Sequence, residues 1–201
     1  PLAKWCIAAG IALGGDHPFG WRLASTVAGA ITLASFFLLG SLFLGGPAGG
    51  HFAATLALTN QLLYVQSRIA MLDPIMMGFL SVAWALFFWS LYRRAHPGLW
   101  AASGVAFGLA CACKWAALIP CLLSVPLLWA HRPQRPQALR TSALLLGGAA
   151  LTYFLVYLPL LHGNLFTDFF RLQAESYSAQ LRVGTDHPYR SAWWTWPLMM
   201  R

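Results

Sequence analysis

The sequence predicts an all-α protein that crosses a membrane several times. Three observations predict this class. Hydrophobic residues make up 59% of the 201 residues, charged residues make up only 9%, and the mean hydropathy is +0.62. A soluble domain carries about 25% charged residues, so a large soluble core is the weaker alternative. The apolar residues also gather in long runs, as they do in helical membrane proteins.

The first apolar segment, residues 3–14, is too short to span a bilayer. We expect it to be a helix that lies at the membrane interface. A polar turn over residues 15–22 follows it. In this turn Asp16 is the expected N-cap of the next helix, and Trp21 suits the level of the lipid headgroups.

The next three segments differ in polarity. Residues 23–44 form an uncharged run that is long enough to span the bilayer, and residues 75–92 form another span. Between them, residues 52–66 are less hydrophobic. Their polar side chains are expected to face other helices rather than lipid; these are Thr55, Thr59, Asn60 and Gln61.

Residues 98–130 can be read as one long tilted helix or as two short helices that meet around Lys114. Basic residues lie before this segment, at residues 93–94, and after it, at residues 132–140. Basic loops tend to face the cytoplasm, so the chain must cross the membrane an even number of times between them. The charges therefore favour two helices and place Lys114 on the opposite face.

The last segments complete a bundle of about six spans. We expect a span at residues 141–161 and an amphipathic surface helix at residues 166–183. Residues 187–197 are expected to form a rigid aromatic stretch at the interface. We expect one membrane domain over residues 1–201. The chain is interpreted as an internal fragment that lacks a first span and is followed by further spans.

The same charge rule assigns the two faces of the membrane. If residues 93–97 face the cytoplasm, the outer, non-cytoplasmic face receives residues 1–22, the corner from Arg68 to Asp73, Lys114 and everything after residue 161. The charged residues that do not belong to a basic inner loop thus share one face, which is the predicted functional face.

The sequence lacks the patterns that are typical of several function classes. There is no zinc-ligand cluster, phosphate loop, nucleophile elbow or dinucleotide fingerprint, and the four cysteines form no disulfide framework. The net charge of +8 can suggest nucleic acid, but no basic run with interleaved aromatic residues is present. Basic cytoplasmic loops and a site for an anionic headgroup explain this charge better. We predict no metal site and no nucleic-acid partner.

Two basic residues of the outer face are candidate ligand-binding groups. Arg22 can bind a phosphate through charge-assisted hydrogen bonds, or it can be an anchor at a helix end. Lys114 lies between two short apolar helices, where a charge is costly without a partner or a ligand. Ligand binding and structural pairing both remain open for Lys114.

The corner from Arg68 to Asp73 also has two possible roles. Arg68 and Asp73 are expected to be partners or helix-end determinants, and Asp73 before Pro74 resembles an N-cap followed by proline at N1. Structural support and direct ligand contact are the alternatives. His17 and His187 each precede a proline and can line a site, although they are more often turn residues. Outer-face carboxylates with no assigned role are Asp168, Glu175 and Asp186.

Five motifs occur in the order in which they are found in one enzyme family. They lie at residues 1–4 (PLAK), 15–22 (GDHPFGWR), 67–73 (SRIAMLD), 113–115 (CKW) and 187–197 (HPYRSAWWTWP). On these motifs the sequence resembles the protein O-mannosyltransferases, which are dolichyl-phosphate-mannose–protein mannosyltransferases with bacterial members that use polyprenyl-phosphate sugars.

The resemblance implies a GT-C glycosyltransferase fold in a bacterial inner membrane, with the active site on the non-cytoplasmic face. It implies an inverting transfer of mannose from polyprenyl-phosphate-mannose to a Ser or Thr hydroxyl of a secreted protein. A carboxylate base would take the proton from the acceptor. Basic residues would stabilise the departing lipid phosphate. The implied partners are membrane lipid, the polyprenyl-phosphate-mannose donor and an acceptor protein. No cofactor is implied. The need for a divalent metal and the oligomeric state stay open.

Site residues follow from the resemblance residue by residue. Arg22 matches an arginine on the phosphate side, and Lys4 and Lys114 match basic positions of the family. The other motif residues are expected to support the site: Asp16, His17, Arg68, Asp73, His187 and Trp193. The family's catalytic acid precedes a His-Pro-Pro-Leu-type motif, so it is expected upstream of Pro1, and the isolated chain is expected to be inactive.

Three alternatives stay open. The same fold can transfer a sugar to a lipid or glycan acceptor, as in aminoarabinose transferases. A transporter is a second alternative, but transporters place charges near the bilayer midplane and often show repeats, whereas here the charges lie at the ends of spans. The third is a non-catalytic membrane subunit that binds a partner enzyme.

Overall fold

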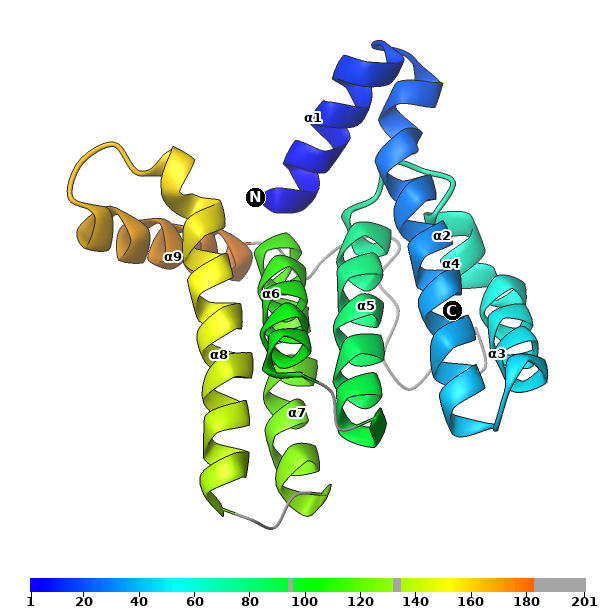
Figure 1. Cartoon of the computed structure of the whole chain (residues 1–201). Coiled ribbons are helices and arrows are strands. Elements are labelled where there is room, and N and C mark those ends of the chain that lie inside the picture. Colours follow the sequence, from blue (N-terminus) through cyan, green and yellow to red (C-terminus); the bar gives the residue numbers. More distant parts are fainter. Residues whose placement is uncertain (94–95, 132–134, 183–201) are drawn as a thin grey trace. The chain divides into compact units, whose positions relative to one another are not determined.

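The computed structural model describes residues 1–93, 96–131 and 135–182, and Figure 1 shows their arrangement. Helices and turns make up these described residues, without a strand, which confirms the all-α prediction. The chain divides into two compact units, Pro1–Tyr157 and Leu158–Arg201.

The first unit contains most of the helices. They are α1 (Leu2–Gly14), α2 (Pro18–Phe43), α3 (Pro47–Thr59), α4 (Gln61–Gln66), α5 (Leu72–Arg93), α6 (Pro97–Cys113), the short 3-10 helix η1 (Trp115–Ala117), α7 (Leu118–His131) and α8 (Arg135–Tyr157). The second unit contains the 3-10 helix η2 (Leu158–Leu160) and α9 (Leu165–Leu181).

Within the described residues, three helical segments are long and apolar enough to cross a membrane: Pro18–Phe43, Leu72–Arg93 and Arg135–Leu160. Shorter apolar helical segments accompany them at Leu2–Gly14, Pro97–Cys113 and Trp115–His131. These helices are consistent with an integral multi-pass membrane protein. The expected count of about six spans is thus met in part, by three segments of full length.

Residues 98–130 form two helices, as the charge pattern predicts. The break lies at Lys114, whose backbone is extended with φ −152° and ψ 141°. Proline residues begin α2, α3 and α6, since Pro18, Pro47 and Pro97 each occupy the first turn, where their missing N–H is not needed.

One prediction about the less hydrophobic segment is wrong. The chain breaks at Asn60, and the polar residues from Thr55 to Gln61 are exposed rather than turned toward other helices. Thr59 Oγ1 donates to the carbonyl of Thr55 in its own helix, and Asn60 Oδ1 accepts from the amide of Leu63. These polar groups satisfy local backbone groups, so they need no partner helix.

The core of the first unit lies between α5, α6 and α8. Phe87 and Phe107 are fully buried there, and Ser103 Oγ on α6 donates to the carbonyl of Ala83 on α5 at 2.9 Å. Gly108 lets α6 approach α8 closely, since a Cβ added to it would lie 2.4 Å from the carbonyl oxygen of Ala149. Small residues at helix contacts are typical of membrane bundles.

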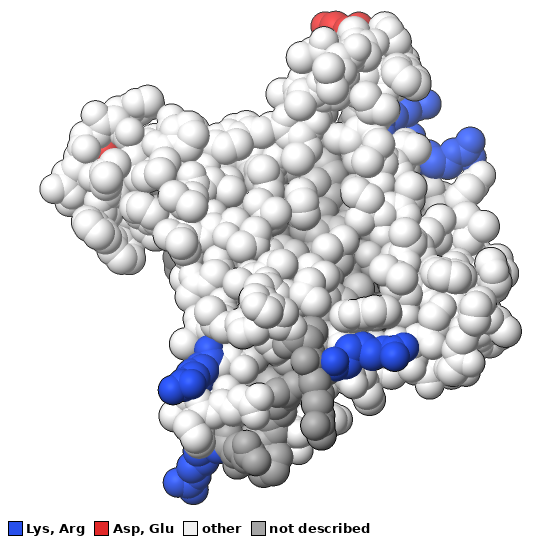
Figure 2. Space-filling view, viewed as in Figure 1, with Lys and Arg blue, Asp and Glu red and all other residues white. Residues whose placement is uncertain are grey.

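The helices of the first unit give it two ends. The turn between α1 and α2, the connection from α4 to α5 and the turn between α6 and η1 lie at one end, which we call the Lys114 end (Figure 1). Figure 2 shows basic side chains at both ends and an uncharged band between them on the visible face. This pattern suits helices whose middle sections lie in hydrocarbon.

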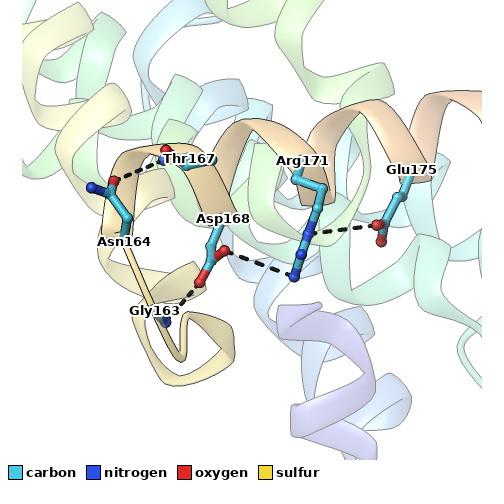
Figure 3. Close-up of polar contacts among 6 residues, drawn as sticks. All are labelled: Gly163, Asn164, Thr167, Asp168, Arg171 and Glu175. Carbon is cyan, nitrogen blue, oxygen red and sulfur yellow. Dashed lines mark hydrogen bonds and ion pairs between the residues drawn. The ribbon is translucent and has the colours of Figure 1, made fainter.

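In the second unit, α9 confirms the helix predicted over residues 166–183. Several of its large apolar side chains, including Phe166, Phe170 and Tyr177, are exposed. Its polar side chains form the contacts shown in Figure 3. A position of α9 at a membrane surface stays a prediction.

Candidate functional site

The centre of the candidate site is an ion pair between two helix ends. Lys114 Nζ donates to Asp73 Oδ1 at 2.6 Å. Asp73 lies in the first turn of α5, and Lys114 follows the last residue of α6. Each charge therefore interacts favourably with the partial charge of opposite sign at its helix end. The two side chains are 27% and 38% exposed, and water therefore screens the pair only in part.

Side chains of α2 hold the connection that leads to Asp73. Ser25 Oγ donates to the carbonyl of Met71, and Thr26 Oγ1 donates to the carbonyl of Ser67, each at 3.1 Å. Gly29, one turn further along α2, allows the close approach, because an added Cβ would lie 2.5 Å from Ser67 Oγ. The corner from Arg68 to Asp73 is thus fixed by contacts that are distant in sequence.

Of the two interpretations of this corner, the pairing of Arg68 with Asp73 is wrong, whereas Asp73 does lie at a helix end, in the first turn of α5. Arg68 Nη1 donates to the hydroxyl of Tyr64, and its guanidinium lies 4.9 Å from the centroid of the Tyr64 ring. Asp73 binds Lys114 instead. Asp73 also lies inside α5, which begins at Leu72, rather than at the N-cap. The physical reason is that packing of α5 beside α6 brings an oppositely charged group within reach of Asp73.

The turn before α2 corrects a second expectation. His17, not Asp16, is the N-cap of α2, and its side chain makes no capping hydrogen bond. Pro18 explains the shift, because the residue before a proline is driven to extended backbone, and His17 has φ −152° and ψ 171°. Asp16 Oδ1 instead accepts a hydrogen bond from the indole N–H of Trp21 at 2.7 Å.

Two other basic residues lie at or near the Lys114 end. Arg22 is exposed, one turn before Thr26 on α2, and therefore on the side that faces the fixed corner. Lys4 is exposed in α1, beside Ala3, which belongs to the same packed cluster as Cys113. Among the residues that the structure describes, neither Lys4 nor Arg22 forms an ion pair.

Two tyrosines that sequence reasoning did not single out are linked to Trp115, the residue that follows Lys114. The indole N–H of Trp115 donates to the hydroxyl of Tyr153 at 2.8 Å, and Tyr153 donates to the hydroxyl of Tyr157 at 3.3 Å. Tyr153 and Tyr157 are four residues apart near the end of a predicted span, so they share one helix face. That spacing is the sequence signal that could have identified them.

The described carboxylates of the second unit have local structural partners. Figure 3 shows Asp168 at the start of α9, where it accepts from the amide of Gly163 at 2.7 Å and lies 3.8 Å from Arg171. Arg171 also lies 3.7 Å from Glu175. These contacts support the helix. Asp186, His187 and Trp193 lie outside the described residues, so their predicted roles remain predictions.

The candidate site of the first unit contains more basic than acidic side chains. Four basic side chains belong to the candidate site, Lys4, Arg22, Arg68 and Lys114, against two carboxylates. Both carboxylates are engaged, Asp73 by Lys114 and Asp16 by Trp21. In the described ranges no group of three or more His, Cys, Asp or Glu side chains could hold a metal ion.

Comparison with known proteins gives a consistent picture. The model of the family described as dolichyl-phosphate-mannose-protein mannosyltransferase matches residues 1–162. No solved structure matches the chain.

The chain is also similar to named transferases. One is an undecaprenyl phosphate-alpha-4-amino-4-deoxy-L-arabinose arabinosyl transferase of Pseudomonas fluorescens, 27% identical over 98% of this chain and 36% of the relative. The transferase of that name in Pseudomonas aeruginosa is 29% identical over the same shares. A polyprenol-phosphate-mannose–protein mannosyltransferase of Corynebacterium glutamicum is 34% identical over 43% of this chain and 17% of the relative. The chain thus spans about a third or less of the length of these relatives.

Proposed function

Because the chain belongs to the dolichyl-phosphate-mannose-protein mannosyltransferase family, we propose that it forms the donor-binding part of a glycosyltransferase that uses a polyprenyl-phosphate sugar. The observation that carries this proposal is the excess of basic side chains at or near the Lys114 end, which also contains the Lys114–Asp73 pair. Such a set suits a lipid phosphate, whose negative charge grows as the glycosidic bond breaks.

The acceptor of the first candidate function is a lipid or glycan. The two relatives that match 98% of this chain carry names for undecaprenyl-phosphate aminoarabinose transfer, which favours the alternative acceptor class over a protein. Transfer of mannose to Ser or Thr hydroxyls of a secreted protein is the second candidate. The family description and the relative from Corynebacterium glutamicum support it.

The basic residues have different roles in this proposal. Arg22 and Lys4, which form no ion pair in the described part of the chain, bind the phosphate directly. Lys114 is held by Asp73 and contributes a positive charge in a fixed position. Neither Asp16 nor Asp73 is proposed as the general base, since each already has a partner. A base outside residues 1–201 stays a prediction.

The test compares two arginines in the complete protein in membranes. Transfer is measured from undecaprenyl-phosphate-aminoarabinose to a lipid acceptor and from polyprenyl-phosphate-mannose to a Ser/Thr peptide. Arg22→Ala should lower kcat/KM by about 10- to 100-fold, the effect of losing a hydrogen bond to a charged group. Arg140→Ala, an exposed arginine on α8, is the control and should keep the activity.

Each outcome of this test is informative. Transfer to lipid alone supports the first candidate, and transfer to peptide alone supports the second. Absence of transfer from either donor in the wild type would refute the proposed function. Equal losses in the two arginine variants would refute the role of Arg22.

A further inference from the structure

Trp115, the residue after Lys114, presents an aromatic ring at the Lys114 end. Its side chain is 38% exposed, and its indole N–H donates to the hydroxyl of Tyr153 on α8 at 2.8 Å. The ring of Tyr153 lies 4.9 Å from the ring of Tyr157, which is buried. The indole is thus fixed by a polar contact at its edge, while part of its surface stays accessible.

The extended backbone at Lys114 directs two neighbouring side chains to different helices. Lys114 has φ −152° and ψ 141°, and successive side chains of extended backbone point to opposite sides. Lys114 accordingly reaches Asp73 on α5, and Trp115 reaches Tyr153 on α8. The charge and the ring therefore start from Cα atoms that are only about 3.8 Å apart.

A second tryptophan shows which part of this arrangement is general. Trp129, near the end of α7, is also 38% exposed and donates its indole N–H to the hydroxyl of Ser142 on α8 at 3.2 Å. Tryptophans of this kind are common anchors at membrane interfaces. What distinguishes Trp115 is its place directly after the paired Lys114 and its link to two tyrosines.

A lipid-phosphate sugar offers a group that suits such a ring. One face of a pyranose consists of C–H groups, which pack on an aromatic ring through dispersion and weak C–H contacts. An amino sugar adds a cation, which the face of an indole also attracts. The carboxylates of the first unit, Asp16 and Asp73, already accept hydrogen bonds from Trp21 and Lys114. An aromatic ring is therefore the better candidate to receive the sugar.

We propose that the exposed surface of Trp115 binds the sugar ring of the donor, with the phosphate on the side of Lys114. This inference rests on the proposed function and adds a residue that recognises the sugar. Tyr153 is a positioning residue, because its hydroxyl fixes the indole. Trp115 thereby distinguishes the sugar-bearing donor from the lipid phosphate that remains after transfer.

The test compares two lipid phosphates that differ only in the sugar, undecaprenyl-phosphate-aminoarabinose and undecaprenyl phosphate. Dissociation constants are measured on the complete, purified protein, and thermal unfolding checks the fold of each variant. Trp115→Leu should weaken the binding of the sugar-bearing donor by about three- to tenfold, the typical effect of losing an aromatic contact. It should leave undecaprenyl phosphate unchanged. Trp129→Leu, the matched control, should change neither.

Two further variants and a second donor refine the test. Trp115→Phe keeps a ring and should recover part of the affinity that Trp115→Leu loses. Tyr153→Phe removes the acceptor of the indole N–H and should weaken donor binding less than Trp115→Leu does. With polyprenyl-phosphate-mannose the effect of Trp115→Leu should be smaller, because mannose carries no cation.

The inference fails if Trp115→Leu weakens both lipid phosphates equally or weakens neither. A photoreactive group on the sugar of the donor provides a second measurement in the wild-type protein. It should label Trp115 or Tyr153, and labelling that misses both side chains would also overturn the inference. Failure of the proposed function is a separate result, namely no sugar transfer by the wild type. The binding comparison tests Trp115 whether or not transfer occurs.

Discussion

Lys114 and Asp73 show how a charge at a helix end obtains its partner. The residues are 41 positions apart, and neither helix alone brings them together. The hydrogen bond of 2.6 Å joins the start of α5 to the end of α6. Because both side chains keep some contact with water, we expect the pair to act more on the position of Lys114 than on stability.

A double-mutant cycle on this pair tests that expectation. Asp73→Asn should lower the free energy of unfolding by about 1 kcal/mol or less. It should lower the rate of sugar transfer further than a smaller folded fraction of the protein can explain. Combined with Lys114→Gln, its effect on transfer should be much smaller than the sum of the single effects. Glu175→Gln, at an exposed carboxylate of α9, is the control and should keep the rate of transfer. Additive effects on transfer would show that Asp73 acts independently of Lys114.

Two local rules explain which site contacts the sequence could reveal. Proline determines the start of α2, so His17 rather than Asp16 is the N-cap, and attention to Pro18 would have given the right residue. The partner of Arg68 is also local, since Tyr64 lies four residues earlier. The partner of Asp73 could not be read from spacing, because it depends on how α5 packs beside α6.

At the scale of helices, close contact between α6 and α8 carries much of the core. Gly104 and Gly108 on α6 face backbone carbonyl groups of α8, at 2.5 Å and 2.4 Å from the position of an added Cβ. Backbone atoms cannot move aside as a side chain can. A methyl group at either position must therefore push the two helices apart.

Gly108→Ala should destabilise the protein by about 1 to 3 kcal/mol through overpacking. Gly147 on α8 provides the matched control, because nothing lies within 4 Å of an added Cβ there. Gly147→Ala should be neutral or stabilising by up to about 1 kcal/mol, since alanine is the better helix former. Thermal unfolding in detergent measures both changes. Equal losses for the two variants would contradict this account of the α6–α8 contact.

The apolar runs predicted the helices well, whereas the polar residues within them were misread. The break at Asn60 divides residues 52–66 into α3 and α4, and an asparagine that caps a following helix is recognisable from sequence. The exposure of Thr55 was not recognisable, because it depends on which helix faces are covered by neighbours.

At the scale of the whole first unit, the assignment of its two ends to membrane faces is still a prediction. Residues near Asp16 should be accessible from the non-cytoplasmic side, and residues near Gln137, at the start of α8, from the cytoplasm. Single cysteines at these positions, in a cysteine-free background, can be labelled with a membrane-impermeant maleimide in oriented vesicles. Labelling of both positions from the same side would refute the predicted orientation.

The ion pair also bears on the order in which the chain enters the membrane during synthesis. α5 is long and apolar enough to cross a bilayer, and Lys114 at the end of α6 contacts Asp73 at the start of α5, so α6 runs back along α5 and brings Lys114 to that end. A lysine that follows a short apolar helix resists insertion. Asp73 precedes Lys114 in the chain and is therefore synthesised first. We expect the carboxylate to pair with Lys114 as α6 inserts, so that the order of the two charges along the chain favours formation of the α5–α6 hairpin.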